Sequence, residues 1–326
     1  MLNLSATALA HPNIAFIKYW GNRDDTLRLP MNSSFSMNLD ALSTTTSVEF
    51  RKEFKHDALV IDGQDASPQA LQRVSAFLDI IRAQMQEKDL KAIIISQNNF
   101  PMGAGIASSA SAFAALAAAA AKAAGLDLDE ASLSRLARRG SGSACRSVPN
   151  GFVEWQAGTS DADSYAFSIA PAEHWQLVDL IAVVSHAHKE VGSSAGHALA
   201  ATSPLQDTRV ADCPRRLQIC RQAILEKDFL AFAEIVELDS NLMHAVMMTS
   251  SPPILYWEPG TVAIMKKVIE WRSQGLQVCY TLDAGPNVHV LCLAQDASQL
   301  EKLLQEAIPG VEMIYHSHAG GGVQVL

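Results

Sequence analysis

The sequence is short of cysteine and of positive charge, and each shortage excludes a class of protein. Five cysteines occur among 326 residues, an odd number with no Cys-x-x-Cys pair. A disulfide framework or a structural zinc site is therefore not expected, and a reducing compartment, the cytoplasm, is the expected location. The formal net charge of −9 argues against nucleic acid or an anionic membrane as the main partner.

A long hydrophobic run is also missing. The longest run of small apolar residues, 104–126, is mostly Ala and includes serines and Lys122, so it is a poor membrane span. The N-terminus has no basic segment followed by an apolar one, and no signal peptide is expected. With 48% hydrophobic and 18% charged residues, the composition is that of a soluble enzyme. The length favours two domains, or one large α/β unit with an extension.

What the sequence does contain is a Gly- and Ser-rich segment between a predicted strand and a predicted helix. Residues 92–95 are apolar and mostly β-branched, which predicts a buried strand. Residues 108–124 are rich in Ala and precede Gly125, which predicts a helix. Such a turn points backbone N–H groups and the positive end of the helix dipole at an anion. Many similar turns bind nothing, and no Walker-type Gly-Lys-Ser or Gly-Lys-Thr follows the glycines.

Hydrophobic spacing predicts further strands and helices along the rest of the chain. Strands are expected at 43–50, 58–62, 151–155, 178–185, 278–281 and 288–294, and helices at 67–88, 127–139, 206–228, 229–248, 259–274 and 297–307. Residues 157–173 are predicted to form an acidic loop. Because the chain beyond residue 184 is largely helical in this prediction, we expect a domain boundary there, which gives domains 1–184 and 185–326.

Two further features each have an ordinary and a functional interpretation. Lys18 follows a run of alternating apolar residues and is either a surface lysine at the end of a strand or a functional cation. Residues 140–147 are mostly small, with Arg146 three positions after Ser143. This turn is either a flexible helix end or an anion-binding site, in which hydroxyls and a guanidinium converge on a phosphate or carboxylate.

Four motifs, in order and across nearly the whole chain, carry a family resemblance. They are Asn-Ile-Ala-x-Ile-Lys-Tyr-Trp-Gly at 13–21, Asn-Asn-Phe-Pro with the Gly/Ser loop at 98–111 (which includes Pro-x-x-x-Gly-Ile-x-Ser-Ser-Ala), Arg-Arg-Gly-Ser-Gly-Ser-Ala-Cys-Arg-Ser at 138–147, and Asp-Ala-Gly-Pro-Asn at 283–287. The second resembles the phosphate loop of the GHMP kinases, and the set resembles their diphosphomevalonate decarboxylase branch. The resemblance implies a homodimer with an α+β, two-domain GHMP kinase fold. Its N-terminal domain would be like domain 2 of ribosomal protein S5, and its C-terminal domain ferredoxin-like.

The resemblance also implies a reaction. In that family ATP phosphorylates the C3 hydroxyl of 5-diphosphomevalonate, and loss of that phosphate and of CO2 gives isopentenyl diphosphate. Asp283 would lie beside the C3 hydroxyl as a general base or orienting group. Lys18 would neutralise the substrate carboxylate or keep Asp283 ionised, because a close cation lowers the pKa of a carboxyl. Phosphorylation turns a tertiary alcohol into a good leaving group, and loss of CO2 quenches the positive charge that develops at C3.

Binding residues follow from the same resemblance. The ATP phosphates would be held by Gly103, Gly105, Ser108 and Ser109. The substrate would be held by Asn13, Tyr19, Asn22, Ser141, Ser143, Arg146, Ser193 and His197. The metal ligands stay open: Mg²⁺ would be bound through the ATP phosphates, with Ser109 as the candidate side chain.

Two positions depart from the family pattern at the diphosphate end of the substrate. Asn22 stands where the family has a lysine, and His197 stands near the position of an arginine. A hydrogen bond to a charged group is worth roughly 1.5–3 kcal/mol, so losing two would weaken diphosphate binding on the order of 10²- to 10⁴-fold. We therefore predict a decarboxylase of 5-phosphomevalonate that makes isopentenyl phosphate. The alternatives are a diphosphomevalonate decarboxylase, a mevalonate-type kinase that does not decarboxylate, and a binding protein on an inactive GHMP fold.

Overall fold

Strand β9 (Lys91–Asn98) and helix α2 (Ser108–Ala123) flank the Gly- and Ser-rich segment, as predicted. The computed structural model describes residues 4–100, 108–185, 191–308 and 310–326, so Gly103 and Gly105 lie outside the described residues. Residues 114–121 of α2 are buried and nearly all Ala. Their small side chains let the helix pack closely on strands β1 (Ser5–Ala10) and β6 (Thr44–Arg51).

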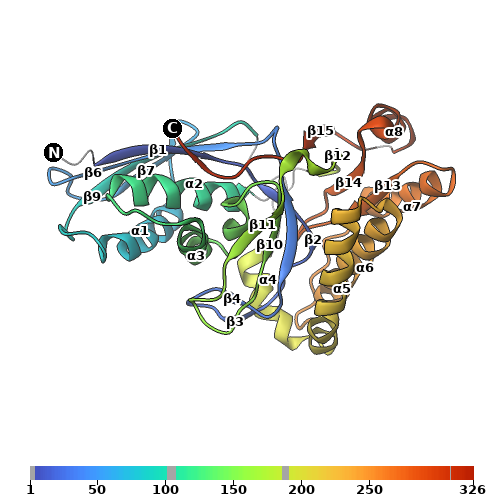
Figure 1. Ribbon diagram of the computed structural model, residues 1–326, viewed down its shortest axis with the longest axis horizontal. Helices are drawn as coiled ribbons and strands as arrows, with labels where there is room; N and C mark the ends of the chain where they lie inside the picture. The colour runs from blue at the N-terminus through green and yellow to red at the C-terminus, as the bar shows by residue number, and fades with distance from the viewer. Residues whose placement is uncertain (1–3, 101–107, 186–190, 309) are drawn as a thin grey trace.

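The first sheet has six strands in the order β16-β1-β6-β9-β7-β8. Its other strands are β7 (Ala58–Ile61), β8 (Gln64–Asp65) and β16 (Gln324–Val325). Buried and less buried residues alternate along β6, as expected for a strand covered on one face. Helices α1 (Pro68–Arg82), α2 and α3 (Glu130–Gly140) cover that face and share one apolar core with the sheet (Figure 1).

The second sheet brings the first candidate residues to the middle of the molecule. Its strands, in the order β11-β10-β5-β2, are β11 (Ala166–Ala170), β10 (Phe152–Trp155), β5 (Ser34–Asn38) and β2 (Asn13–Ile17). Every residue of β2, β5 and β10 is buried. A short hairpin of β3 (Asn22–Asp24) and β4 (Leu29–Pro30) follows β2. The predicted loop 157–173 is wrong where β11 forms, because that short strand is defined by its long-range pairing with β10 rather than by local pattern.

The third sheet is antiparallel, with the strand order β13-β14-β12-β15. Its strands are β12 (Leu177–Val183), β13 (Val278–Thr281), β14 (Val288–Leu293) and β15 (Met313–His318). The helices of this half are α4 (Ser193–Leu199), α5 (Gln206–Glu226), α6 (Phe229–Met248), α7 (Pro259–Ser273) and α8 (Ala294–Ala307). The order of strands and helices is ferredoxin-like, as expected. The sequence pattern predicted all of these helices except α4.

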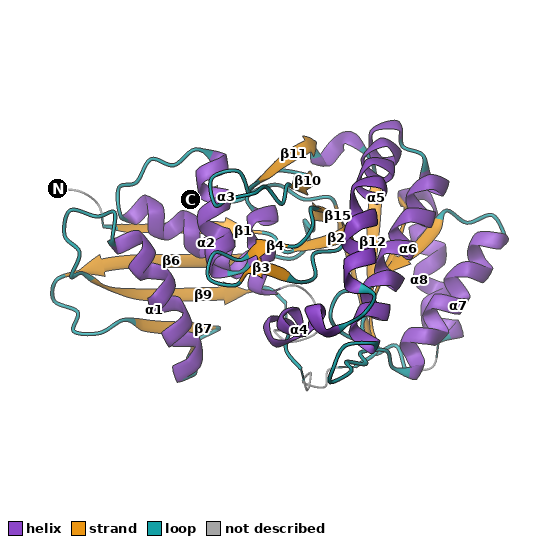
Figure 2. Cartoon of the chain, turned by 90° about the horizontal axis from the view of Figure 1, so that it is seen from below, coloured by secondary structure: helices purple, strands orange, loops and turns teal. Residues whose placement is uncertain are grey.

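Helices α5 and α6 form a tightly linked pair. Lys227 ends α5 in the left-handed region, with φ 59°, and the carboxylate of Asp228 accepts the first free N–H groups of α6. The two helices pack on each other and on β2. Figure 2 shows them standing across the end of the molecule opposite α1, with β2 reaching toward them. The end of β2 therefore meets side chains from the C-terminal half.

The halves are not cleanly separated in sequence. Strand β12 pairs with β14 and β15, so the boundary expected at residue 184 falls after a strand of the C-terminal sheet. We propose that the division lies before β12. The chain end then returns to the first half, where β16 pairs with β1. Among the described residues, no helix has both the length and the apolar character that crossing a membrane requires.

Candidate active site

Lys18 leaves β2 at the junction of the two halves and meets Asp283, which follows β13. Its Nζ atom lies 2.8 Å from Oδ1 of Asp283, across 265 residues of sequence. The Lys18 side chain is 1% exposed and that of Asp283 is 26% exposed. Lys18 is thus a buried cation, and the surface-lysine interpretation is wrong. The pair opens to solvent on the side of the carboxylate, where a substrate can reach it.

The environment of the pair keeps Asp283 ionised. Burial is the largest single effect and acts to raise the pKa of the Asp283 carboxyl, but the charge and hydrogen bond of Lys18, together with the charges of His289 and Arg146, lower that pKa below its ordinary value. Burial also lowers the pKa of Lys18, against the attraction of Asp283. An ionised carboxylate can accept a proton from a hydroxyl, as a general base must.

The second small-residue turn is a 3-10 helix (Gly142–Ser147) that points Arg146 inward. Arg146 is 4% exposed, and its guanidinium donates to Oδ1 of Asn13 at 3.1 Å and to Oγ of Ser34 at 2.8 Å. Asn13 in turn donates to the carbonyl of Ser143 at 3.2 Å and to Oγ of Ser147 at 2.8 Å. The turn is therefore a fixed structure rather than a flexible helix end. It holds a buried cation whose charge reaches Asp283.

Ser109, predicted to bind ATP, lies within hydrogen-bond distance of Ser141, predicted to bind the substrate. The hydroxyls of Ser109, in the first turn of α2, and Ser141, just after α3, are 3.3 Å apart. Ser108 and Ser109 also line a mostly apolar cavity between α1, α2 and the first sheet. On the α1 side, the Arg73 guanidinium lies 4.5 Å from the centre of the Phe113 ring. Sequence reasoning missed this cavity, because no local motif marks it.

His197 and Asn22 lie together at the other side of Tyr19. The His197 ring stacks on Tyr19 and Trp20, with ring centres 4.2 and 4.6 Å apart. Its Nδ1 atom accepts the backbone N–H of Gly21 at 2.9 Å, and only glycine readily adopts the φ of +93° found there. The Tyr19 hydroxyl donates to Oδ1 of Asn22.

This arrangement leaves His197 uncharged. A nitrogen that accepts a hydrogen bond carries no proton, so the imidazole is in its neutral form. Burial lowers the pKa of His197 to about 3, helped by the charges of Arg28, Arg209 and Arg146. Neither His197 nor Asn22 therefore supplies a cation at neutral pH.

Comparison with known proteins identifies the family of the chain. Residues 10–166 match the family model of the diphosphomevalonate decarboxylase-like N-terminal domain. Residues 179–322 match the mevalonate 5-diphosphate decarboxylase C-terminal domain. The chain belongs to the mevalonate diphosphate decarboxylase family. The expected resemblance and the GHMP kinase fold are thereby confirmed.

Relatives in this family cover most of the chain. The diphosphomevalonate decarboxylase of Candida albicans is 43% identical over 299 residues, covering 87% of this chain and 83% of that protein. That of Saccharomyces cerevisiae is 40% identical over 332 residues, covering 94% and 83%. A solved structure described as MDDEF in complex with MVAPP, AMPPCP and magnesium has a TM-score of 0.93 at 38% identity, covering 99% of this chain and 98% of that one. The mevalonate diphosphate decarboxylase structure from Staphylococcus aureus has a TM-score of 0.92 at 37% identity, with the same coverage.

Not every predicted residue of this family site is brought into contact. Ser193 is exposed at the first position of α4, one helical turn before His197. Ser143 contacts Asn13 through its backbone carbonyl, which accepts a hydrogen bond from the Asn13 side chain. Within the described parts of the chain, no cluster of three or more His, Cys, Asp or Glu side chains is placed to hold a metal ion.

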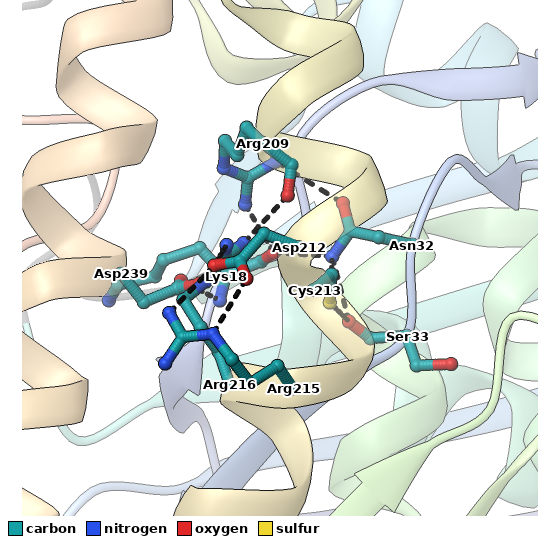
Figure 3. A network of polar contacts seen from close by, with 9 residues as sticks. All are labelled: Lys18, Asn32, Ser33, Arg209, Asp212, Cys213, Arg215, Arg216 and Asp239. Carbon is teal, nitrogen blue, oxygen red and sulfur yellow. Dashed lines mark hydrogen bonds and ion pairs between the residues drawn. The ribbon is translucent and has the colours of Figure 1, made fainter.

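Sequence reasoning missed the residues that hold the backbone of Lys18 (Figure 3). The Lys18 N–H donates to Oδ2 of Asp239 at 2.6 Å. Its carbonyl accepts from Arg209 at 2.7 Å and from Asn32 at 2.9 Å. One signal was available: Arg209 and Arg216 are seven positions apart on a predicted helix, and so share one face. What that face contacts could not be read from the spacing.

Proposed function

We propose that this protein catalyses the ATP-dependent decarboxylation of a 5-phosphorylated mevalonate, with mevalonate 5-phosphate as the preferred substrate. The products are isopentenyl phosphate, ADP, phosphate and CO2. The contact between the Lys18 ammonium and the Asp283 carboxylate, open to solvent on the carboxylate side, is the observation that carries the reaction. The uncharged group of His197 and Asn22 favours the monophosphate.

The chain's own residues have distinct parts in the chemistry. Asp283 accepts the proton of the C3 hydroxyl as the hydroxyl oxygen attacks the terminal phosphorus of ATP, whose bond to the bridging oxygen breaks so that ADP leaves. The C3–O bond then breaks and phosphate leaves with the electron pair. The bond to the carboxylate breaks next, CO2 departs, and its electrons form the double bond of the product. Lys18 keeps Asp283 ionised, and Arg146 is a fixed cation for an anionic group of the substrate.

The nucleotide fits the N-terminus of α2. Ser108 and Ser109 lie in its first turn, where the helix dipole favours phosphate. The adjoining apolar cavity, with Arg73 over Phe113, can take the adenine base. The relative described in complex with AMPPCP and magnesium supports ATP and Mg²⁺ as the reactants. Mg²⁺ neutralises phosphate charge when it is bound, with Ser109 as the candidate side-chain ligand.

The comparisons and the geometry of the site favour different substrates, the diphosphate and the monophosphate. The relatives are named diphosphomevalonate decarboxylases, so the comparisons on their own favour the diphosphate enzyme that was kept as the alternative. The geometry favours the monophosphate. The side chain of Asn22 accepts a hydrogen bond from the Tyr19 hydroxyl and donates one to Asp25. Protonation of His197 is unfavourable near pH 7, because its pKa is lowered. A second phosphate at this end would bring negative charge without a cation from either residue.

The deciding experiment compares kcat/KM with ATP and Mg²⁺ for mevalonate, its 5-phosphate and its 5-diphosphate, with ADP and CO2 measured in the same reaction. We expect the monophosphate to be preferred by about tenfold or more, with one CO2 released per ADP. Preference for the diphosphate would show that another cation replaces the missing two, and Arg28, whose charge already acts on His197, is the first to test. ADP without CO2 would identify a kinase. No ATP turnover with any of the three would indicate an inactive GHMP fold. The homodimer and the cytoplasmic location stay predictions, the first testable by light scattering.

A further inference from the structure

Two consecutive residues of α6 hold the backbone on both sides of the catalytic pair. Asp239 accepts the N–H of Lys18 at 2.6 Å. Ser240 accepts the N–H of Leu282 at 3.0 Å, and Leu282 directly precedes Asp283. Lys18 follows a strand of the second sheet and Asp283 follows a strand of the third. The relative position of the Lys18 and Asp283 side chains therefore depends on two adjacent residues of α6.

The hydrogen bonds of Asp239 and Ser240 are shielded from water, which keeps them rigid. Asp239 and Ser240 are both 0% exposed. The second carboxylate oxygen of Asp239 accepts from Nε of Arg216 at 2.7 Å, and Arg216 is also fully buried. Arg216 donates onward to the carbonyl of Arg209, whose guanidinium holds the carbonyl of Lys18. Figure 3 shows Asp239 lying between Lys18 and Arg216. A buried charge with all of its partners in place has little freedom to move, since losing a partner is costly.

We propose that Asp239 and Ser240 are positioning residues for the decarboxylation, which set the separation of the Lys18 ammonium from the Asp283 carboxylate through the backbone of Lys18 and of Leu282. This role presupposes the proposed function and adds to it the residues that assemble its catalytic pair. Neither residue is assigned to touch substrate. A displacement of about 1 Å at a reacting group can cost 10²-fold in rate, so the hold on Leu282 has a measurable effect.

Several charged or titratable groups face Asp283, and the test must separate them. Lys18 approaches it from β2, His289 from β14 and Arg146 from the 3-10 helix. His244 of α6 interacts with the backbone of Leu282 and Asp283. If Ser240 no longer holds Leu282, the Asp283 carboxylate moves relative to all of these groups. The contact that changes most directly is the one with Lys18, which is its nearest partner. The pKa of the Asp283 carboxyl therefore reports the geometry directly.

The test uses Ser240→Ala, with Ser250→Ala as the matched control. Ser250 is also a buried serine, just beyond the end of α6, but its hydroxyl donates to the nearby carbonyls of Met247 and Pro252. Both variants lose one buried hydroxyl. For Ser240→Ala we expect kcat to fall by about tenfold, an unchanged KM for ATP, and a rise in the pKa of Asp283. That pKa is followed by carboxyl ¹³C NMR, with the signal assigned from Asp283→Asn. For Ser250→Ala we expect neither change.

Two conservative variants separate positioning from folding. Ser240→Thr keeps the hydroxyl, so the pKa of Asp283 and kcat should stay near the parent values even if packing lowers the melting temperature. Ser240→Cys keeps the size but offers a weaker acceptor, and should give an intermediate effect if Ser240→Ala does not fold. A Ser240→Ala protein whose kcat and Asp283 pKa match those of Ser250→Ala would overturn the proposal. The titration needs no turnover, so it still tests the hold on Leu282 if the parent protein releases no CO2.

Discussion

The Nδ1 atom of His197 accepts a hydrogen bond from the backbone N–H of Gly21, at 2.9 Å, and this bond fixes the histidine as neutral. A protonated ring would place two N–H groups against each other, in a half-buried position between Tyr19 and Trp20. The charge of the substrate end of the site is therefore set by the local fold rather than by pH within the physiological range. Changes to that charge require substitution, for example at Asn22.

Asn22→Lys should move substrate preference toward the diphosphate. The side chain is only partly buried, and a lysine there adds a cation beside Tyr19. One added charged hydrogen bond of about 1.5 kcal/mol corresponds to roughly tenfold in the ratio of kcat/KM for diphosphate over monophosphate. The ratio is measured by ADP release with each substrate. Gln84→Lys, on an exposed turn after α1, adds the same charge elsewhere and should leave the ratio unchanged; an equal change in both variants would refute the site-specific effect.

Asp283→Asn should nearly abolish turnover while sparing nucleotide binding. The amide cannot accept a proton at the C3 hydroxyl, and loss of a general base costs about 10²- to 10⁴-fold in rate. The measurements are kcat from coupled ADP and CO2 assays, and the affinity for a non-hydrolysable ATP analogue by calorimetry. Asp65→Asn, an exposed carboxylate on β8, is the control. Full activity of Asp283→Asn would remove it from the catalytic role.

Lys18→Met should raise the pKa of Asp283. In the parent protein the ammonium of Lys18 lowers that pKa against the opposing effect of burial, so removal of the cation leaves burial less opposed. A carboxyl with a raised pKa is protonated over a wider acidic range, and the acid limb of any residual activity moves to higher pH. Carboxyl ¹³C NMR gives the value without turnover. Lys18→Arg keeps the charge, and its Asp283 pKa should stay closer to that of the parent; a lower pKa in Lys18→Met would contradict the assignment.

Local motifs predicted one part of this site, and long-range packing decided the other. Lys18, Arg146 and Asp283 each sit in a short segment whose neighbours form a recognisable pattern, so the sequence pointed to all three. Asp239 and Ser240 lie in the middle of an amphipathic helix, where nothing local separates them from other helix residues. Their partners are 221 and 42 positions away. Only the packing of α6 against β2 and β13 shows what they hold.

The fold divides in the same way. Periodicity predicted α5, α6 and α7, because long helices repeat their pattern over several turns, and Ala-rich composition predicted α2. It missed the short helix α4 and strand β11, and β11 takes its structure from pairing with β10. The division that we propose before β12 differs from the boundary predicted at residue 184 for a related reason: a fully buried strand carries no signal of which sheet it joins.

The buried histidine behind the catalytic pair predicts how stability depends on pH. Burial lowers the pKa of His244 to about 3. Its side chain is 1% exposed, and Nε2 has no hydrogen-bond partner among the residues that the structure describes. In the unfolded chain the pKa of His244 is near its ordinary value of 6.5, so below that pH the unfolded chain binds a proton that the folded protein does not bind. The stabilisation is thus fully present above about pH 6.5 and is lost progressively as the pH falls toward 3. At pH 5 the loss from this residue is about 2 kcal/mol.

His244→Phe should remove that part of the acid sensitivity. Phenylalanine does not titrate and can pack against Tyr256 and Trp257, whose rings border the histidine. The free energy of unfolding is measured in urea at pH 7 and pH 5. The difference between the two pH values should be about 2 kcal/mol smaller in His244→Phe than in the parent protein. His56→Phe, at an exposed position, should keep the parent's difference. If His244→Phe keeps it as well, the acid sensitivity arises from other groups, and His244 is accommodated in its charged form when the protein is acidified.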